Sequence, residues 1–295
     1  MVDIPTSNSA SPAMHLSSAS DALVLDTGAV LRNGSGAASG ETILLLGKIR
    51  IRNGGHYIHR TVRSNAYIID HLAADSSTVH GIFEFDVPGT AGYTVSLTGN
   101  VFGDLRFSAS AAGGTKSYSG SGASDLIIRG SLAIGPGAQL TSTMTADIRL
   151  GGDLITEGTM NLHPVTAGMA GRRLILTGVM AMASGSGTIS LGNNFRNVEI
   201  VAGASVILHR AFDLPSPSQA WWLLAGAYLD MDTNLIRGAG AFHSEPGATL
   251  RIGSMEGITT GDSGNLRTAI RQLDTGMTFI YARAGTQHTG DALPS

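Results

Sequence analysis

Two pairs of acidic residues stand two positions apart in segments typical of strands, Glu84 with Asp86 and Asp230 with Asp232. Successive side chains of a strand point to opposite faces, so both acids of a pair lie on one face. Such carboxylates could hold Ca²⁺, or act as an acid/base pair on a polysaccharide. The alternative is a solvated outer face with the apolar neighbours turned inward, which needs no cofactor.

Histidines form a second candidate group, with His56 and His59 in a His-x-x-His pair and His71 and His80 downstream. A zinc site needs three or four converging ligands. Because positions i and i+3 of a strand face opposite sides, this spacing argues against a shared metal.

Two glycine-rich phrases resemble catalytic motifs only locally. Residues 261–264 (GDSG) copy the phrase around some serine nucleophiles, but a triad also needs a histidine base and an orienting acid in reach, and the sequence places neither. We expect a loop there. The phrase 185–187 (GSG) opens no capped helix, so it does not predict a phosphate-binding loop.

The two tryptophans, Trp221 and Trp222, are adjacent. On a strand, one enters the core and the other faces out, where it could contact a glycan or a protein partner. The alternative is a loop covering an irregular coil after Pro215 and Pro217.

A row of threonines, Thr141, Thr143 and Thr145, has the alternation of an outward strand face. A surface ladder requires matching rows on neighbouring coils, and the sequence reveals none, so no ligand surface is predicted from it.

The elements that must carry these residues follow a repeat. Gly-Ala followed by alternating apolar residues recurs at Gly28, Gly137, Gly203, Gly226 and Gly247, with looser copies at Gly158 and Gly178. From Gly137 onward the steps are 21, 20, 25, 23 and 21 residues. A turn glycine that precedes a short strand at a near-constant period is typical of a stacked solenoid.

We therefore predict an all-β fold: one elongated parallel β-helix with about 22 residues per coil, right-handed because parallel crossovers have that hand. An antiparallel sandwich is the competing architecture. In the first half a step of 37 residues, from Gly55 to Gly92, hides either a missed coil or an inserted loop around 71–78. Residues 218–224 and 266–273 are weak helix candidates.

Composition excludes several function classes. The net charge of −3 and the absence of a basic stripe argue against nucleic-acid binding. There is no cysteine, so disulfides and thiol catalysis are excluded. No apolar run is long enough to span a membrane. Charged residues make up only 14% of the chain, whereas hydrophobic residues make up 42%, which suits a narrow aliphatic core.

Residues 1–20 are expected to form a flexible leader, rich in Ser and Asn, and residues 21–295 the solenoid domain. No signal-peptide pattern begins the chain. Because strand edges at the end of a solenoid need caps, we expect further coils of the same polypeptide beyond the C-terminus, so the chain is expected to be truncated there.

Several phrases carry a family resemblance: 113–119 (GGTKSYS), 194–200 (NFRNVEI), 247–254 (GATLRIGS), 257–259 (GIT), 264–267 (GNLR) and 289–294 (TGDALP). Over about residues 40–295 the chain resembles the repeat-built β-solenoid regions of large secreted or surface proteins of Bacteroidota-type bacteria, which often precede a type IX secretion sorting domain. The resemblance implies an extracellular or cell-surface location and a structural or adhesive role, with no catalytic residue.

Two functions follow as hypotheses. The first is a structural stalk or adhesin-like segment without catalysis, whose partners would be surface glycans or other proteins. The second is a carbohydrate-active β-helix protein, either a polysaccharide lyase or hydrolase or a glycan-binding module. A groove with three or more carboxylates and arginines on adjacent coils would favour the second hypothesis, and a featureless face the first.

Overall fold

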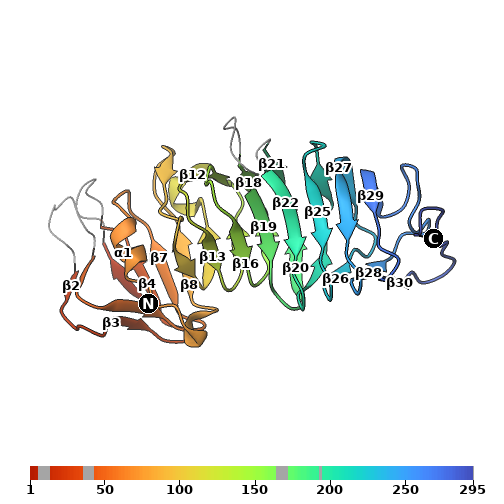
Figure 1. The fold of residues 1–295 in the computed structure, drawn as a ribbon. Coiled ribbons are helices and arrows are strands. Elements are labelled where there is room, and N and C mark those ends of the chain that lie inside the picture. Colours follow the sequence, from red (N-terminus) through yellow and green to blue (C-terminus); the bar gives the residue numbers. More distant parts are fainter. Residues whose placement is uncertain (6–13, 36–42, 164–171, 193–194, 295) are drawn as a thin grey trace.

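The chain winds into an elongated solenoid whose two termini lie at opposite ends (Figure 1). The computed structural model describes residues 1–5, 14–35, 43–163, 172–192 and 195–294. It is nearly all β, with 4% helix, in about 10 turns of roughly 25 residues. The predicted all-β parallel solenoid is confirmed. The coils are longer than the predicted 22 residues, because several corners carry extended loops such as residues 60–81.

One sheet runs the whole length of the molecule. Its twelve strands, in spatial order, are β1 (Val2–Ile4), β4 (Val30–Asn33), β7 (His56–His59), β8 (Ile82–Phe85), β11 (Asp104–Phe107), β14 (Leu132–Ile134), β17 (Leu154–Thr156), β20 (Ala181–Ser184), β23 (Ser205–Leu208), β26 (Tyr228–Asp230), β28 (Thr249–Ile252) and β30 (Thr278–Tyr281).

Two further sheets form the other walls along most of the rod. A nine-stranded sheet contains β10 (Val101–Phe102), β13 (Leu126–Ile128), β16 (Ile148–Leu150), β19 (Arg172–Leu176), β22 (Phe195–Ile200), β25 (Ala220–Leu223), β27 (Ile236–Ser244), β24 (Phe212–Leu214) and β29 (Leu266–Gln272). A five-stranded sheet contains β21 (Thr188–Leu191), β18 (Thr159–Leu162), β15 (Ala138–Ser142), β12 (Lys116–Gly120) and β9 (Tyr93–Thr94).

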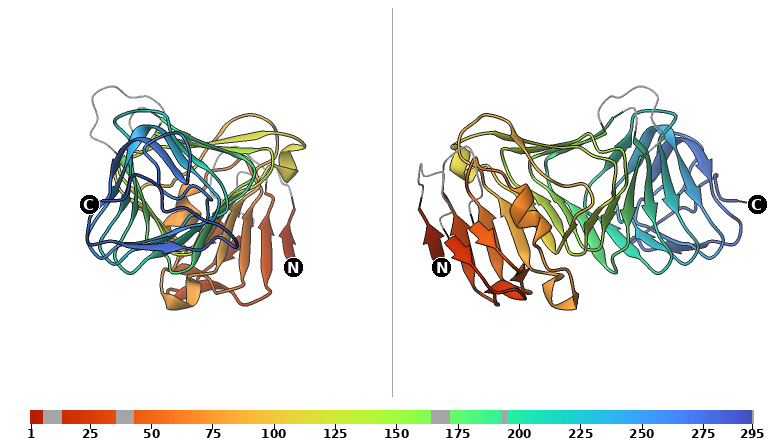
Figure 2. Two further views of the ribbon diagram at one scale, coloured as in Figure 1. Left: turned by 90° about the vertical axis from the view of Figure 1, so that its right-hand side faces the viewer. Right: turned by 60° about the vertical axis from the view of Figure 1, so that its left-hand side comes forward.

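At the N-terminal end, two small sheets complete the first coils. They pair β2 (Met14–Leu16) with β5 (Ile43–Leu45), and β3 (Asp21–Leu25) with β6 (Lys48–Ile51). Residues 1–20, expected as a leader, thus contribute β1 and β2, and β1 pairs with β4 through Val2 and Leu31. Seen from one end and obliquely, the coils lie one behind another (Figure 2).

Every pairing between the named strands is parallel, for example β8 with β11 and β14 with β17. Within the described ranges, the one antiparallel contact is an isolated bridge between Ile258 and Gly264. A strand can have parallel neighbours only through a crossover, so this pairing rules out the antiparallel sandwich.

The core is a column of side chains stacked from coil to coil. Tyr57, Phe83, Leu105, Leu132 and Leu154 occupy one such row, since the register aligns each with the next. All five are at most 2% exposed. Continuous burial of this kind contributes roughly 1.5–3 kcal/mol per large side chain, which explains how short strands form a stable rod.

The Gly-Ala copies form tight corners. Those at Gly203, Gly226 and Gly247 lead into the long sheet, whereas the copy at Gly137 leads into β15 of the five-stranded sheet. Gly137, Gly203, Gly226 and Gly247 have φ between 73° and 78°, and the alanine after each is buried. At 245–248 the Ala248 amide donates to the Glu245 carbonyl across Pro246 and Gly247, the pattern of a type II turn. In the copy assigned to Gly178, the left-handed residue is instead Met180, φ 56°, followed by buried Ala181.

Helix is confined to short corners: α1 (Ala66–Asp70), η1 (Ser76–Thr78) and η2 (Ser110–Ala112). The first two fall in the long step of the repeat. No coil is missed there, because β7 and β8 are neighbours in the long sheet. The step is long because residues 60–81 form an inserted loop and because Gly92 precedes β9 of the five-stranded sheet, whereas Gly55 precedes β7 of the long sheet. The helix candidates 218–224 and 266–273 were wrong: β25 and β29 lie there. No described helix is both long and apolar enough to cross a membrane.

Candidate functional site

The outer face of the long sheet carries a concentrated group of polar side chains on neighbouring coils. We call it the polar strip: Arg32, His56, Arg60, Glu84, Asp86, Arg106, Ser108 and Ser110. The strand register creates this strip. Ile58 is aligned with Arg32 on one neighbouring strand and with Glu84 on the other, and Glu84 is aligned in turn with Arg106. The ladder continues past the strand ends, where the Arg60 amide donates to Asn33 and the Asp86 amide to His59.

Glu84 is the hub of the strip. Its carboxylate lies 2.7 Å from His56 Nε2 and accepts a 2.5 Å hydrogen bond from Ser108 Oγ, with Arg106 Nη1 at 3.9 Å. Burial raises the pKa of Glu84, but the contacts from His56 and Ser108 and the charge of Arg106 outweigh it and hold that pKa below its usual 4.5. Glu84 is therefore ionised at neutral pH, which does not suit a general acid.

Ser108, Glu84 and His56 share a catalytic triad's residue types but not its order. In a triad the histidine stands between the nucleophile and the acid, so that it can take the serine proton. Here the carboxylate stands in the middle, and Ser108 donates directly to it. This arrangement orders the face and does not activate a nucleophile.

Asp86 anchors the turn η2 to the sheet. It is 5% exposed and accepts hydrogen bonds of 2.7 Å from Ser110 Oγ and from the Ala111 amide. Arg60 Nε stands 3.6 Å away, too far for a hydrogen bond. The Asp86 carboxylate is thus satisfied by neutral donors, while Arg60 contributes only its nearby charge.

Two hollows flank η2. The arginine hollow, about 430 Å³, is lined by residues that include Asp3, Arg32, Gly34, Arg60, Pro88 and Ala111. The serine hollow, about 460 Å³, is lined by residues that include Ser108, Ser110, Gly113, Gly114, Gly135 and Pro136.

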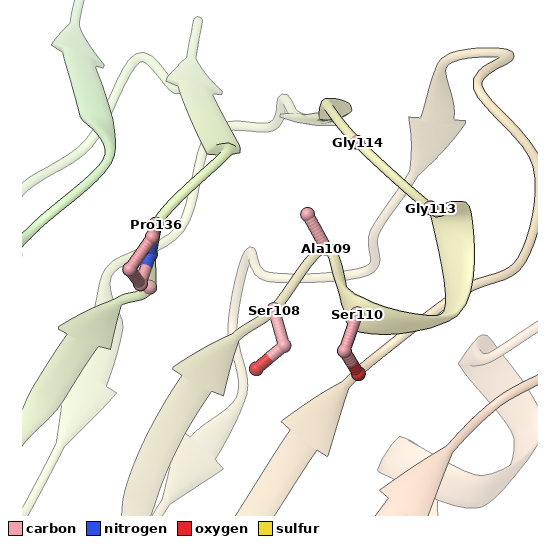
Figure 3. A pocket seen from close by; sticks show the side chains of 7 residues that line it. Ser108, Ala109, Ser110, Gly113, Gly114 and Pro136 are labelled. Carbon is pink, nitrogen blue, oxygen red and sulfur yellow. The ribbon is translucent and has the colours of Figure 1, made fainter.

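Figure 3 shows that mostly backbone and small side chains wall the serine hollow. Each hollow contains a glycine beside the strip, Gly34 next to Arg60 and Gly135 next to Ser108, and the missing side chain leaves the space open.

The second acid pair lies far along the same sheet. Asp230 contacts Arg251 Nη1 with both carboxylate oxygens, at 2.8 and 2.7 Å, and also accepts from the Asp232 amide. Asp232 itself is exposed. The inward neighbours Phe83, Phe85, Leu229 and Met231 are all buried, at 0–1% exposure.

Glu84, Asp86 and Asp230 face outward, as expected, but each is no more than 9% exposed. They are therefore covered by their partners and do not form the solvated face of the alternative interpretation. In the described part of the chain, no three His, Asp or Glu side chains gather as a metal-binding group.

The histidines separate as the strand geometry predicts. His56 belongs to the polar strip, whereas His59 is fully buried in the core. His71 Nδ1 lies 2.7 Å from the Tyr67 carbonyl, and His80 lies 3.6 Å from Asp104.

The tryptophans also divide, which rules out the loop alternative. Trp221 is fully buried against Phe212, so it cannot contact a glycan. Trp222 is half-buried on the outer face of the nine-stranded sheet and stacks on His243 at 4.3 Å between ring centroids. One ring face of Trp222 is therefore covered by His243.

The remaining motifs have structural partners. Ser263 hydrogen-bonds Thr259, and among the described residues no histidine reaches it. Ser186 binds the Glu157 carboxylate on the preceding coil.

Thr141 is aligned with Ser119 and Asn161 on the neighbouring coils. Thr143 and Thr145 instead donate to backbone carbonyls of the preceding coil.

This geometry defines a parallel β-solenoid with one polar strip on its long sheet. No protein-family model matches the chain, and searches of curated proteins and of solved structures give no match. The functional argument therefore rests on the residues themselves.

Proposed function

We propose that the chain is a rigid structural rod of the adhesin-like kind, which holds attached parts of a protein at a fixed separation. The observation that supports this most directly is the unbroken twelve-stranded sheet from β1 to β30, with a core column running beside it. Parallel ladders that continue through every coil resist bending, and termini at opposite ends suit a spacer (Figure 1). The proposal includes an extracellular or cell-surface location, following the family resemblance.

Removing one coil tests the rod. Deleting residues 132–153 joins Ser131 to Leu154, and because Leu132 and Leu154 are register partners, β11 can pair with β17 in the same alignment. The chain has no cysteine, so spin labels can be placed at V24C and I280C, both exposed sites near opposite ends. Electron–electron resonance should give one narrow distance that shortens by about 5 Å, the spacing of neighbouring strands.

Duplication of the same segment is the matched control and should lengthen that distance by about 5 Å. A broad distribution of the distance between the labels, or a distance that does not change with the number of coils, would refute a rigid spacer.

A carbohydrate-active protein is the second candidate, and the polar strip favours it. Two carboxylates of the strip, Glu84 and Asp86, and the neighbouring Asp104 lie with several arginines on adjacent coils. Against hydrolysis stands the lowered pKa of Glu84, which keeps the hub carboxylate ionised. A screen of acidic and neutral polysaccharides, with and without Ca²⁺, should give no cleavage. Turnover that Glu84→Gln abolishes would replace the rod-only function with an enzymatic one.

A further inference from the structure

The arginine hollow contains a guanidinium that donates no hydrogen bond to the described part of the chain. Among the described residues, Arg60 makes one ionic contact, the 3.6 Å approach to Asp86, and no hydrogen bond through its side chain. Its side chain is 36% exposed. By contrast, Arg149 and Arg251 donate to their carboxylates at 2.9 and 2.8 Å. Arg60 therefore presents a fork of N–H donors to the hollow.

Asp86 leaves these donors free for a structural reason. Ser110 Oγ and the Ala111 amide already satisfy its carboxylate at 2.7 Å. Arg60 is held close by charge alone, so a ligand can engage it without breaking a hydrogen bond of the fold.

A second cation stands on the same wall. Arg32, on the strand beside Arg60, uses one nitrogen on Asp3 at 3.2 Å. Its register partner is Ile58, two residues before Arg60, so the two guanidinium groups rise from neighbouring outward positions. Gly34, also on this wall, has no side chain that could fill the space between them.

The lining is mixed in charge, and this narrows the ligand class. Two arginines suit an anionic group, because a guanidinium recognises carboxylate oxygens in a bidentate manner. The Asp3 carboxylate, half exposed, can only accept hydrogen bonds and would repel a compact inorganic anion. Hydroxyl donors next to an acid group would satisfy both sides. A volume of about 430 Å³ lies within the roughly 300–1,000 Å³ of small-molecule sites.

We propose that the arginine hollow binds the carboxylate-bearing sugar of an acidic glycan, with the sugar carboxylate on Arg60 and Arg32 and its hydroxyls on Asp3. The proposal deepens the adhesin-like function and rests on it, since it names the ligand class for an adhesive face.

Calorimetric titration of the full chain with trigalacturonic acid tests this site. We expect saturable binding that weakens as salt rises, while galactotriose and inorganic phosphate bind at least tenfold more weakly. Arg60→Gln should weaken trigalacturonate binding by about tenfold or more, because charge-assisted hydrogen bonds are lost. The thermal midpoint should not change, since Arg60 makes no side-chain hydrogen bond in the described structure.

Arg149→Gln, which removes a paired arginine from the nine-stranded sheet, is the matched control and should bind like the unaltered chain. Three results would overturn the proposal: no binding of trigalacturonate, equal binding of galactotriose, or binding that Arg60→Gln leaves unchanged. None of these alters the length measurement of the rod, so failure of the site is distinguishable from failure of the proposed function.

Discussion

Lowering the pH should destabilise the solenoid through a histidine enclosed in its core. His59 is fully buried beside Phe85, with Nε2 2.8 Å from the Tyr93 hydroxyl and 3.3 Å from the Arg63 carbonyl. No acidic side chain is among its contacts in the described residues. Burial lowers the pKa of His59 to about 4, because the charged imidazolium would lose its hydration without gaining a counter-ion.

Proton linkage gives the sign and the size of this pH dependence of the free energy of unfolding. The unfolded histidine has a pKa of about 6.5, so in the range between the two values the unfolded state binds a proton that the folded state does not. The stabilisation is fully present above pH 6.5 and is lost as the pH falls toward 4. With a folded pKa of about 4, the free energy of unfolding should drop by about 2 kcal/mol between pH 7 and pH 5.

Urea unfolding at pH 7 and pH 5 measures this loss, and His59→Gln isolates it. The glutamine amide can still bond the Tyr93 hydroxyl but does not titrate, so the pH dependence of the variant should be about 2 kcal/mol smaller. The comparison is needed because burial also lowers the pKa of His163 to about 4, and this second histidine adds a slope of its own. The reasoning would be refuted if the free energy of unfolding changed equally with pH in the unaltered chain and in His59→Gln. It would also be refuted if NMR showed the imidazole of folded His59 titrating near pH 6.5.

Three further changes test other parts of the fold by urea unfolding. Lys116→Met should lower the free energy of unfolding by about 2 kcal/mol, because the buried ammonium donates to the Pro88, Gly89 and Ala91 carbonyls. Amide exchange in residues 87–92 should become faster in this variant, and unchanged exchange would contradict the prediction. Phe107→Ala should lower the free energy of unfolding by about 3–5 kcal/mol, because it leaves a cavity where the Phe107 ring stacks on Phe85 in the core. A loss under 1 kcal/mol would contradict this packing. Gly158→Ala should cost about 1–3 kcal/mol because its Cβ would meet the Ala138 carbonyl oxygen at 2.2 Å, whereas Gly92→Ala, where no atom lies within 4 Å, should stay within about 0.5 kcal/mol.

The repeat could be predicted because its corner has a strict backbone requirement. Only a residue that tolerates positive φ fits the third position of a type II turn, so Gly203, Gly226 and Gly247 keep a visible phase in the sequence. At Met180 the requirement is the same but the residue differs, and the apparent copy was therefore assigned two positions too early, at Gly178. The buried alanine after the turn, Ala181, was the better marker of the corner.

Short apolar segments could not be assigned from their own pattern. Residues 218–224 and 266–273 are too short to distinguish the 3.6-residue period of a helix from the two-residue period of a strand. The neighbouring coil decides: Trp221 aligns with Val198, and Phe242 aligns in turn with Trp221, so the ladder holds β25 extended. Sequence alone gives no such neighbour until the register is known.

The polar strip escaped prediction for the same reason. Glu84 and Asp86 were recognised as a pair, and His56 as a histidine of interest, but Arg60, Arg106 and Ser108 lie about one coil away and show no shared motif. Their meeting depends on register, and a slip of one residue would turn each side chain to the opposite face. These residues could have been found by searching about one coil length before and after Glu84 and Asp86 for polar residues that share their outward alternation.

The strand that builds the strip also builds the core, and this gives the strip its rigidity. Phe83 and Phe85 face inward from β8 while Glu84 and Asp86 face outward, so the packing that fixes the two rings also fixes the two carboxylates. Asp86 in turn pins η2, which separates the two hollows. A ligand in the arginine hollow would therefore meet a wall whose η2 side is already ordered, which lowers the entropic cost of binding on that side. Loosening the core at Phe85 should weaken binding there without touching a residue of the hollow.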